Sequence, residues 1–316
     1  IIYFGLTTME IIFLLFGKMP LYDAICTSLG TAGTGGFGIK NDSFCGYNVY
    51  LQWVVTIFMI LFGVNFNAYY LLFFGHLRDA LKVVEVRYYF GIIIASVVVI
   101  SVNIAHMCTG VFDAVTKAAF QVGSIITTTG FSSTDFDRWP ELSKTLLVLL
   151  MFIGACAGST GGGIKVSRIV IAVKTILKEL NGYIHPKSVK KLTFEHKPVD
   201  HDVIRSINVY FMTYAVIFVV SMLLVSVENY DFTTNFTAVA ATFNNIGPGL
   251  SLVGPTCNFG FFNNFSKYVL MFDMLAGRLE LFPLLILFHP SIWKELFIQA
   301  DKKVKGNRKE KQDVRM

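Results

Sequence analysis

The sequence predicts an all-α integral membrane protein, built from tandem repeats in which two apolar helices flank a re-entrant loop. Of its 316 residues, 54% are hydrophobic and 15% are charged, whereas about a quarter of the residues of a soluble domain carry charge. Three similar glycine-containing loops, at residues 33–37, 127–131 and 244–249, separate the apolar segments. Each loop follows a stretch too short to cross a bilayer, so the chain is expected to turn back inside the membrane.

Seven apolar runs are long enough to form helices. They cover residues 1–17, 49–75, 90–105, 142–153, 164–177, 207–227 and 268–288. A helix needs about 20 residues to cross the hydrocarbon core. We interpret the fourth and fifth runs as halves of one broken span, and therefore expect six spans. The first run carries Glu10 and lacks a basic leader, so it is not a signal peptide.

The three glycine loops belong to an internal repeat. Aligned on Gly35, Gly130 and Gly247, they are 95 and 117 residues apart. An aromatic residue followed by aspartate precedes each loop, at Tyr22-Asp23, Phe112-Asp113 and Tyr230-Asp231. Aspartate is a favourable helix N-cap, so short half-helices are expected at residues 24–31, 114–126 and 232–243, each ending at its loop.

Glycine has a physical role in such loops. Pointing successive backbone carbonyls towards one axis requires positive φ angles, which glycine adopts at little cost. The C-terminus of each half-helix carries about −0.5 of an elementary charge, so converging half-helices favour a cation at their focus. Irregular backbone at membrane depth is tolerated only where protein buries it or where it lines water. The repeat therefore predicts a cation pathway lined by backbone carbonyls.

A second glycine-rich segment, residues 154–163, interrupts the fourth and fifth apolar runs. Its ten small residues include five glycines, which are poor helix formers. A phosphate-binding loop requires lysine directly after its last glycine, but Ile164 stands there and Lys165 follows one residue late. We therefore expect an irregular intramembrane loop and exclude nucleotide binding by it.

The basic residues predict an orientation in the membrane. Most of them lie in residues 78–87, 165–205 and 294–316, on the side opposite the glycine loops, whereas acidic residues gather near the loops. This distribution fits the positive-inside rule, and the acidic side raises the local concentration of cations. It explains the net charge of +6 without nucleic acid as a partner. The five cysteines lack paired spacing, so neither a disulfide framework nor a metal site is expected.

Polar residues inside the apolar runs are candidate functional residues. Arg278 lies near the middle of the last run, where insertion costs about 2.5–3.5 kcal/mol unless the side chain faces the protein interior or a cavity. We expect it to line the ion path, with an ion pair to another helix as the alternative. The pair Asn65 and Asn67 is expected to satisfy backbone or helix–helix hydrogen bonds, and Asn244 with Asn245 to shape the ion site.

Four motifs in a fixed order carry a family resemblance. They are TTTGFSSTDFDRWP at residues 127–140, GACAGSTGGGIK at 154–165, NNIGPGLSLVGP at 244–255 and GRLE at 277–280. Through them the chain resembles the Trk/Ktr/HKT potassium-transporter superfamily, closest to its TrkH-type transmembrane subunits, over essentially all 316 residues. The resemblance implies four tandem helix–pore-loop–helix repeats around a central ion pore, usually in a homodimer.

Three of these four repeats are found in the sequence. Residues 1–76 correspond to the family's second repeat, residues 77–187 to the third, residues 188–293 to the fourth, and residues 294–316 form a basic cytoplasmic tail. The family's first repeat would precede Ile1, so we expect the chain to be truncated at its N-terminus and unable to close a four-sided filter by itself.

The resemblance also implies site residues. One glycine of each loop is the key residue of a K⁺ selectivity filter, here Gly35, Gly130 and Gly247, with Gly36 as an alternative register in the first loop. The expected K⁺-binding set is Gly33, Thr34, Gly35, Gly36, Thr128, Thr129, Gly130, Asn245, Ile246 and Gly247. The 154–163 loop is implied to be a gate below the filter, and the expected gate residues are Gly158, Ser159, Thr160, Gly161, Gly162, Gly163, Lys165 and Arg278.

The function implied is potassium uptake across the cell inner membrane by a multi-pass pore subunit that is not an enzyme. The chain is expected to bind no cofactor and to carry K⁺, and whether Na⁺ or H⁺ is coupled stays open. The implied partners are a second copy of the subunit, membrane lipid and a cytosolic TrkA-type nucleotide-binding ring. A sodium-dependent Ktr-type subunit is one alternative, which Glu280 disfavours. A membrane scaffold or non-conducting fragment is another, and an ATP-hydrolysing enzyme is disfavoured because the chain has no complete phosphate-binding motif.

Overall fold

The computed structural model describes residues 2–76, 82–185, 192–195, 197–279, 281–288, 290 and 293–294. The chain divides into two compact units, residues 1–278 and 279–316. The second unit contains α13 (Leu281–Leu287), and Trp293 Nε1 donates a hydrogen bond to the Leu287 carbonyl at 2.6 Å. The predicted boundary of the tail, at residue 294, lies inside this unit. Glu280 and residues 295–316 lie outside the described residues.

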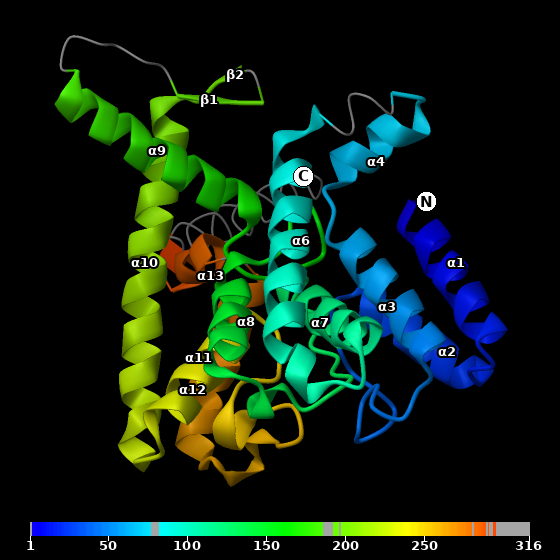
Figure 1. Cartoon of the computed structure of the whole chain (residues 1–316). Helices are drawn as coiled ribbons and strands as arrows, with labels where there is room; N and C mark the ends of the chain where they lie inside the picture. The colour runs from blue at the N-terminus through cyan, green and yellow to red at the C-terminus, as the bar shows by residue number, and fades with distance from the viewer. Residues whose placement is uncertain are drawn as a thin grey trace, which may run out of the picture. The chain divides into compact units, whose positions relative to one another are not determined.

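The first unit is almost entirely helical, as the sequence predicts. Figure 1 shows its helices in three groups that follow one another along the chain. The first group contains α1 (Ile2–Phe16), α2 (Leu21–Ala32), α3 (Val49–Phe62) and α4 (Phe66–Phe73); the second contains α6 (Val84–Ile104), α7 (Val111–Ile126), α8 (Glu141–Ile153) and α9 (Val166–Ile184); the third contains α10 (His201–Val225), α11 (Phe232–Phe243) and α12 (Asn264–Arg278).

Short elements join these helices. They are the 3₁₀ turns η1 (Ala105–Met107), η2 (Phe136–Arg138), η3 (Ser226–Glu228), η4 (Ser251–Val253) and η5 (Phe259–Phe261), and the strands β1 (Thr193–Phe194) and β2 (Lys197–Pro198). The two strands pair antiparallel, with Thr193 opposite Pro198 and Phe194 opposite Lys197. This hairpin is the one departure from an all-α fold in the described residues, and four residues of strand leave the fold class unchanged.

The three half-helices are confirmed as α2, α7 and α11. The predicted aspartate caps are confirmed only for α11, where Asp231 is the N-cap and its side chain accepts from the Thr234 amide. Asp23 and Asp113 lie one turn later, each at the third residue of its helix, because Pro20 and Gly110 take the N-cap positions of α2 and α7. All three carboxylates remain near the positive end of a helix dipole, which is favourable.

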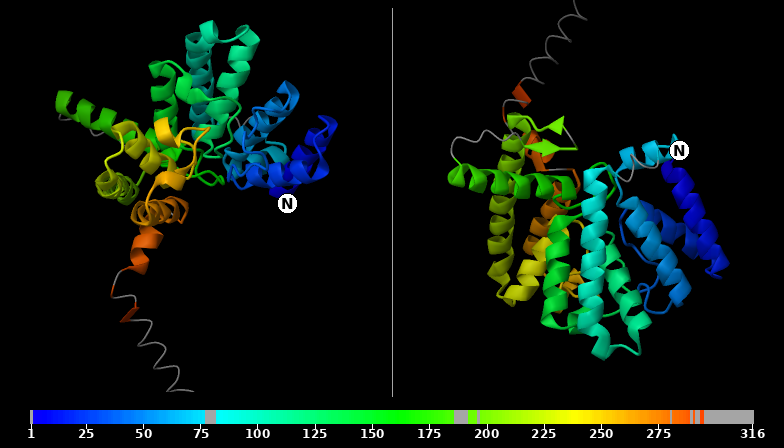
Figure 2. Two further views of the ribbon diagram at one scale, coloured as in Figure 1. Left: turned by 90° about the horizontal axis from the view of Figure 1, so that it is seen from below. Right: turned by 45° about the horizontal axis from the view of Figure 1, so that its top comes forward.

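Within the described residues, two helices are long and apolar enough to cross a membrane, residues 84–107 and 201–228, and a third span is present if α3 and α4 form one bent span. The expected total of six spans, one of them broken, stays a prediction, because several of the expected spans are shorter or interrupted helices. Hydropathy does not register such breaks. The chain bends by 96° between α3 and α4, and α9 runs across the direction of α8 instead of continuing it (Figures 1 and 2).

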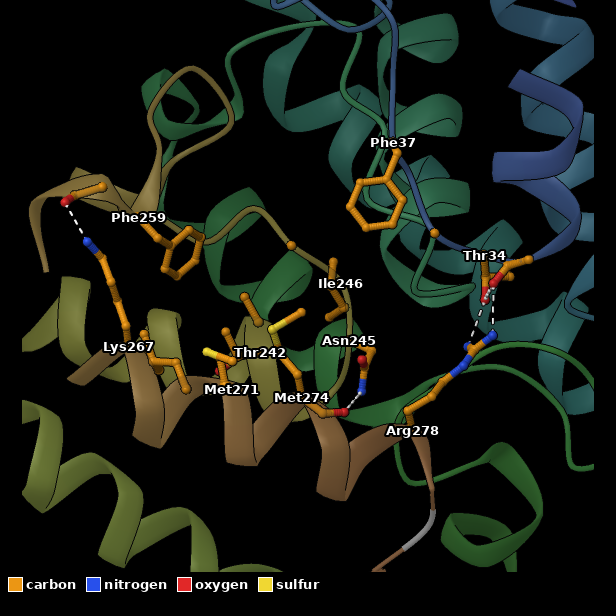
Figure 3. Close-up of a pocket in the computed structure, with 16 residues that line it drawn as sticks. Thr34, Phe37, Thr242, Asn245, Ile246, Phe259, Lys267, Met271, Met274 and Arg278 are labelled. Carbon is orange, nitrogen blue, oxygen red and sulfur yellow. Dashed lines mark hydrogen bonds between the residues drawn. The ribbon is translucent and has the colours of Figure 1, made fainter. Parts of the chain in front are cut away.

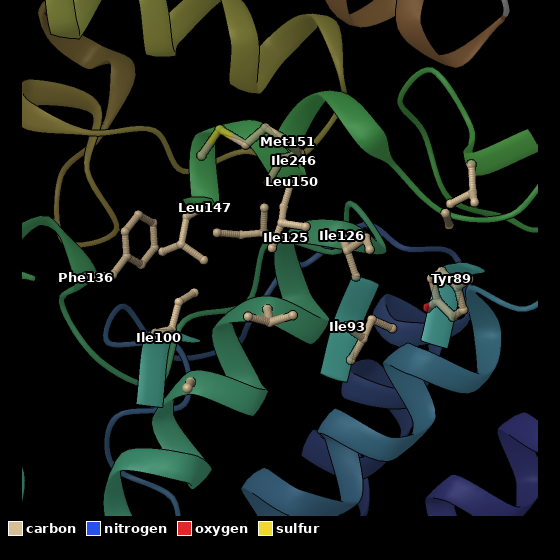
Figure 4. Packing of buried hydrophobic residues seen from close by; sticks show 14 of the residues in the cluster. Tyr89, Ile93, Ile100, Ile125, Ile126, Phe136, Leu147, Leu150, Met151 and Ile246 are labelled. Carbon is tan, nitrogen blue, oxygen red and sulfur yellow. The ribbon is translucent and has the colours of Figure 1, made fainter. Parts of the chain in front are cut away.

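The core is centred on α7. This half-helix packs against α6, α3 and α8, and eleven of its sixteen residues are buried. Figure 4 shows Ile125 and Ile126 of α7 among Tyr89 and Ile93 of α6 and Leu147 and Leu150 of α8. Because side chains in such a core are held at close-packed density, the C-terminal end of α7 has a fixed position, and so does the loop that follows it.

The Asp231 cap gives a prediction about stability. Its carboxylate accepts from the Thr234 amide at 3.0 Å and from the Thr234 hydroxyl at 2.5 Å, and the hydroxyl contact holds the pKa of Asp231 below its ordinary value. Asp231→Ala should lower the free energy of unfolding by about 1 kcal/mol at pH 7, as measured by thermal unfolding in detergent. Asp231→Asn should keep most of that stability.

The same carboxylate should give a pH dependence of known sign. Because its pKa is depressed in the folded protein, its contribution is present above the unfolded pKa of about 3.9 and is lost as pH falls through the lower folded value. The stability difference between the native protein and Asp231→Ala should therefore shrink below about pH 4. A difference that grows on acidification would contradict this assignment.

Candidate functional site

The three glycine loops share one backbone conformation. In each, a residue with positive φ comes two positions after the end of the half-helix: Thr34 (48°), Thr128 (57°) and Asn245 (58°). A glycine with positive φ follows two positions later: Gly36 (63°), Gly130 (88°) and Gly247 (107°). The residues between them, Gly35, Thr129 and Ile246, each donate their amide to a carbonyl inside the half-helix at 2.8–2.9 Å. The loops are therefore equivalent residue by residue.

This equivalence corrects the register expected for the first loop. Gly36, and not Gly35, occupies the position of Gly130 and Gly247, four residues after its half-helix. Gly35 has the position of Thr129 and Ile246, where side chains are accepted, and φ is not positive there. Two adjacent glycines made both registers compatible with the sequence, and only the backbone angles separate them.

Glycine is required because neighbouring loops pack backbone against backbone. A Cβ atom at Gly36 would lie 1.8 Å from the Thr129 carbonyl oxygen, and one at Gly130 would lie 1.9 Å from the Ile246 carbonyl oxygen. The first loop therefore contacts the second and the second contacts the third. A Cβ atom at Gly247 would meet nothing within 4 Å, so the described residues form a row of three loops with one open side.

A cavity of about 670 Å³ lies at this open side. Figure 3 shows it between the first loop, with Thr34 and Phe37, the third loop, with Asn245 and Ile246, and the helix α12, with Met271, Met274 and Arg278. Gly247 also lines it. Most of these side chains are apolar, and Arg278 contributes the charge nearest to the first loop.

The 154–163 loop lies against the first residues of the three glycine loops. The Gly162 amide donates to the Thr128 hydroxyl at 2.6 Å, and the Thr34 hydroxyl donates to the Thr160 carbonyl at 3.1 Å. A Cβ atom at Gly162 would lie 2.5 Å from the Asn244 carbonyl oxygen, and one at Gly161 would lie 3.1 Å from that of Thr127. Only glycine lets the loop approach these carbonyls so closely.

Two basic side chains hold the 154–163 loop in place. The Lys165 Nζ donates to the Gly161 carbonyl. Arg278 donates from Nη1 to the Thr160 carbonyl at 3.0 Å and from Nη2 to the Gly33 carbonyl at 3.0 Å, and its Nη1 lies 3.4 Å from the Thr34 hydroxyl. The guanidinium thus bridges the 154–163 loop and the foot of the first glycine loop. These hydrogen bonds go to two carbonyls and a hydroxyl, and Arg278 also lines the cavity. Its expected role in the ion path stays a prediction.

The remaining expected residues lie close to these contacts. Gly158 and Gly163 have positive φ, and the Ser159 hydroxyl donates to the Cys156 carbonyl at 2.6 Å. Asn245 donates to the Met274 carbonyl of α12 at 3.0 Å. Asn244 does not face the cavity, because its side chain accepts from the Tyr214 hydroxyl of α10 at 3.0 Å. Of the two asparagines, only Asn245 lines the cavity.

The sequence reasoning missed Glu85. Its side chain is buried at the start of α6 and accepts hydrogen bonds from the Ala157 and Ser167 amides and from the Asn65 side chain. Asn65 behaves as expected, since its side chain also accepts from the Asn67 backbone amide at 2.8 Å. For Asn67, the described hydrogen bond involves the backbone and not the side chain. The available signal was an acidic residue five positions before the apolar run 90–105, but its partners come from three other segments.

Comparisons with known proteins bear on this geometry. The family model TrkH, described as a cation transport protein, matches residues 2–295. The Trk system potassium uptake protein TrkH of Salmonella typhimurium is 35% identical over 300 residues, which cover 93% of this chain and 62% of that protein. The protein of the same name from Vibrio parahaemolyticus is 36% identical over 300 residues, with 93% and 61% covered. The Halomonas elongata protein TrkI is 29% identical over 297 residues, with 93% and 60% covered.

A solved structure agrees with these relatives. The crystal structure of the potassium transporter TrkH from Vibrio parahaemolyticus superposes with a TM-score of 0.86 at 35% identity, covering 92% of this chain and 63% of that one. The chain thus spans less than two thirds of the length of these relatives. The family model covers nearly the whole chain, and the chain is a membrane protein that belongs to the TrkH family of cation transport proteins.

Proposed function

We propose that this chain is the ion-translocating part of a potassium uptake system of the Trk type. The observation that carries the proposal is the row of three equivalent glycine loops, each at the C-terminal end of a half-helix and each packed backbone to backbone on the next. Rings of backbone carbonyls can replace the hydration shell of K⁺. The negative ends of α2, α7 and α11 add a favourable field for a cation at their focus.

The selectivity filter in this proposal consists of residues Gly33–Gly36, Thr127–Gly130 and Asn244–Gly247. A fourth strand would close the ring on the open side, beside Gly247 and the 670 Å³ cavity. Support for this comes from the relatives, named potassium uptake proteins, of whose length the chain spans about 62%. Transport by the intact protein is therefore what the proposal concerns.

The 154–163 loop and Arg278 would form the gate below the filter. In this structure, Gly161 and Gly162 lie against the Thr127 and Asn244 carbonyls, and Arg278 binds the Gly33 carbonyl. The carbonyls of Gly33, Thr127 and Asn244, the first residues of the three proposed filter segments, are thus covered from one side. Displacing the loop would uncover them, so we interpret the conformation as closed.

The proposed membrane setting is supported by the charges. The basic segments, residues 78–87, 165–205 and 294–316, would face the cytoplasm, and the glycine loops would open to the outside of the cell inner membrane. The membrane potential, about 2.3 kcal/mol per charge per 100 mV, would drive K⁺ inwards. From the family resemblance we propose a homodimer as the assembly and a cytosolic nucleotide-binding ring of TrkA type as the regulator. The names of the relatives, which assign them to a Trk system, support the presence of further subunits.

The corrected filter register can be tested with two neighbouring glycines. In the intact transporter, Gly36→Ala should reduce K⁺ uptake by at least roughly tenfold, because left-handed strain alone costs about 1–2 kcal/mol and the new Cβ would overlap the Thr129 carbonyl. Gly35→Ala should be milder, because its Cβ would meet only the Phe37 ring, at 3.1 Å. K⁺-limited growth and ⁸⁶Rb⁺ uptake measure both, and the opposite ranking would restore Gly35 as the key glycine.

The closed contact of the 154–163 loop gives a second prediction. Gly162→Ala should raise K⁺ flux in the unstimulated protein, because a Cβ atom 2.5 Å from the Asn244 carbonyl oxygen forces the loop away. The matched control is Gly91→Ala in α6, where a Cβ atom would meet nothing within 4 Å. Flux into proteoliposomes measures both variants. If Gly162→Ala leaves the resting flux at the control level, the loop is not the barrier.

Neutralising Arg278 should also favour the open state. Hydrogen bonds from charged donors contribute about 1.5–3 kcal/mol each, so Arg278→Gln should raise the resting flux by roughly tenfold or more. Lys267→Gln is a suitable control, because Lys267 lines the same cavity but donates to Gly260, away from the 154–163 loop (Figure 3). Equal flux in both variants would remove Arg278 from the gate.

A further inference from the structure

The base of the 154–163 loop is held by one buried carboxylate, that of Glu85. Only 2% of its surface is exposed. Its Oε1 accepts from the Ala157 amide at 2.7 Å and from the Ser167 amide at 3.1 Å. Its Oε2 accepts from the Asn65 side chain at 3.0 Å. Burying a carboxylate is costly unless hydrogen bonds compensate it, and these three donors supply that compensation.

The three donors come from three separate segments of the chain. Ala157 belongs to the 154–163 loop, Ser167 is the second residue of α9, and Asn65 caps α4 in the preceding repeat. A single oxygen therefore ties the loop to the N-terminus of α9, where the helix dipole favours negative charge. The other oxygen ties the same side chain to the bend between α3 and α4.

Backbone hydrogen bonds strengthen this junction. The Cys156 amide donates to the Gly63 carbonyl at 3.1 Å, and the Phe66 amide donates to the Gly158 carbonyl at 3.4 Å. Gly63 and Phe66 flank the 96° bend between α3 and α4. The base of the loop is thus docked on that bend, while its tip, Thr160–Gly162, contacts the glycine loops.

We propose that Glu85 is a positioning residue that couples α4 and α9 to the 154–163 loop, so that a displacement of either helix is transmitted to the loop. The consequence for ion flow rests on the gating role proposed above. The coupling itself concerns only the position of the 154–163 loop, which can be measured without any ion transport.

A reciprocal swap tests the hydrogen bond directly. In Glu85→Gln, the new amide would face the Asn65 amide, so two donors would meet and the junction should loosen. In Asn65→Asp, two carboxylates would meet at the 3.0 Å separation of the present hydrogen bond. Repulsion between their like charges should push them apart and loosen the junction.

The double variant, Glu85→Gln with Asn65→Asp, reverses the direction of that hydrogen bond. The introduced glutamine can donate to the introduced aspartate, which can still accept from the Asn67 amide. The carbonyl oxygen of the same glutamine can still accept from the Ala157 and Ser167 amides. Because every donor and acceptor of the junction is paired again, the double variant should be close to the native protein.

Cys156 is a native reporter for the loop. It is buried and its thiol is free, and its amide is part of the junction. With Cys26, Cys45, Cys108, Cys257 and any cysteine in the remainder of the intact transporter replaced by serine, N-ethylmaleimide labelling follows Cys156 alone. Labelling should accelerate at least roughly tenfold in Glu85→Gln, equivalent to about 1.4 kcal/mol in the opening equilibrium, more in Asn65→Asp, and return to within about threefold of native in the double variant.

The control is Glu141→Gln, which makes the same chemical change at an acid paired with Lys144 at the start of α8, and it should not alter labelling. Size-exclusion profiles in detergent confirm that each variant is folded. Asn65→Asp adds a negative charge near Cys156, which by itself would slow thiolate formation, so faster labelling of this variant reports loop opening. The proposal is overturned if folded Glu85→Gln labels at the native rate, if folded Asn65→Asp labels no faster than native, or if the double variant stays as fast as the single ones. Because labelling needs no ion flux, these outcomes do not depend on whether the glycine loops select potassium.

Discussion

The constraint on which the structure depends is the close approach of a carbonyl oxygen of one glycine loop to the key glycine of the preceding loop. Thr129 presents its oxygen to Gly36, and Ile246 presents its oxygen to Gly130, at distances that exclude any Cβ atom. Such contacts hold only if each loop is placed to within a few tenths of an ångström. The half-helices α2, α7 and α11 provide that placement, because each fixes its loop through the same set of carbonyl acceptors.

Part of this arrangement is predictable from the sequence. The glycine spacing, the aromatic-aspartate pairs and the lengths of the half-helices located all three loops, because local patterns record local backbone requirements. The register at Gly35 and Gly36 was ambiguous, since both residues can adopt positive φ and the deciding neighbour, Thr129, lies 93 residues away along the chain. The breaks in the expected spans were not predictable for a similar reason, because hydropathy measures apolar length and the 96° bend at Gly63–Asn65 leaves it unchanged.

The side-chain contacts of the site were even harder to predict from the sequence. Glu85 reaches Ala157 across 72 positions, and Arg278 reaches Gly33 across 245. Neither partner set follows from spacing, because the contacts depend on how separate repeats pack. The composition of the 154–163 loop indicated only irregular backbone. That its small residues serve a close approach to the carbonyls of Thr127 and Asn244 follows from the packing, and it explains why two adjacent glycines are needed there.

The three glycine loops have equivalent backbones but make different contacts with the 154–163 loop, because a single segment packs against all three. The 154–163 loop has no internal repeat, so it cannot make the same contacts with all three equivalent glycine loops. The 154–163 loop forms hydrogen bonds with the hydroxyls of Thr34 in the first glycine loop and Thr128 in the second. The equivalent residue of the third loop, Asn245, instead donates to Met274 of α12, one turn before Arg278. Arg278 in turn donates to the Thr160 carbonyl of the 154–163 loop. Each of the three glycine loops is therefore joined to the 154–163 loop by hydrogen bonds, two directly and one through α12, so displacement of the 154–163 loop would release hydrogen bonds at all three.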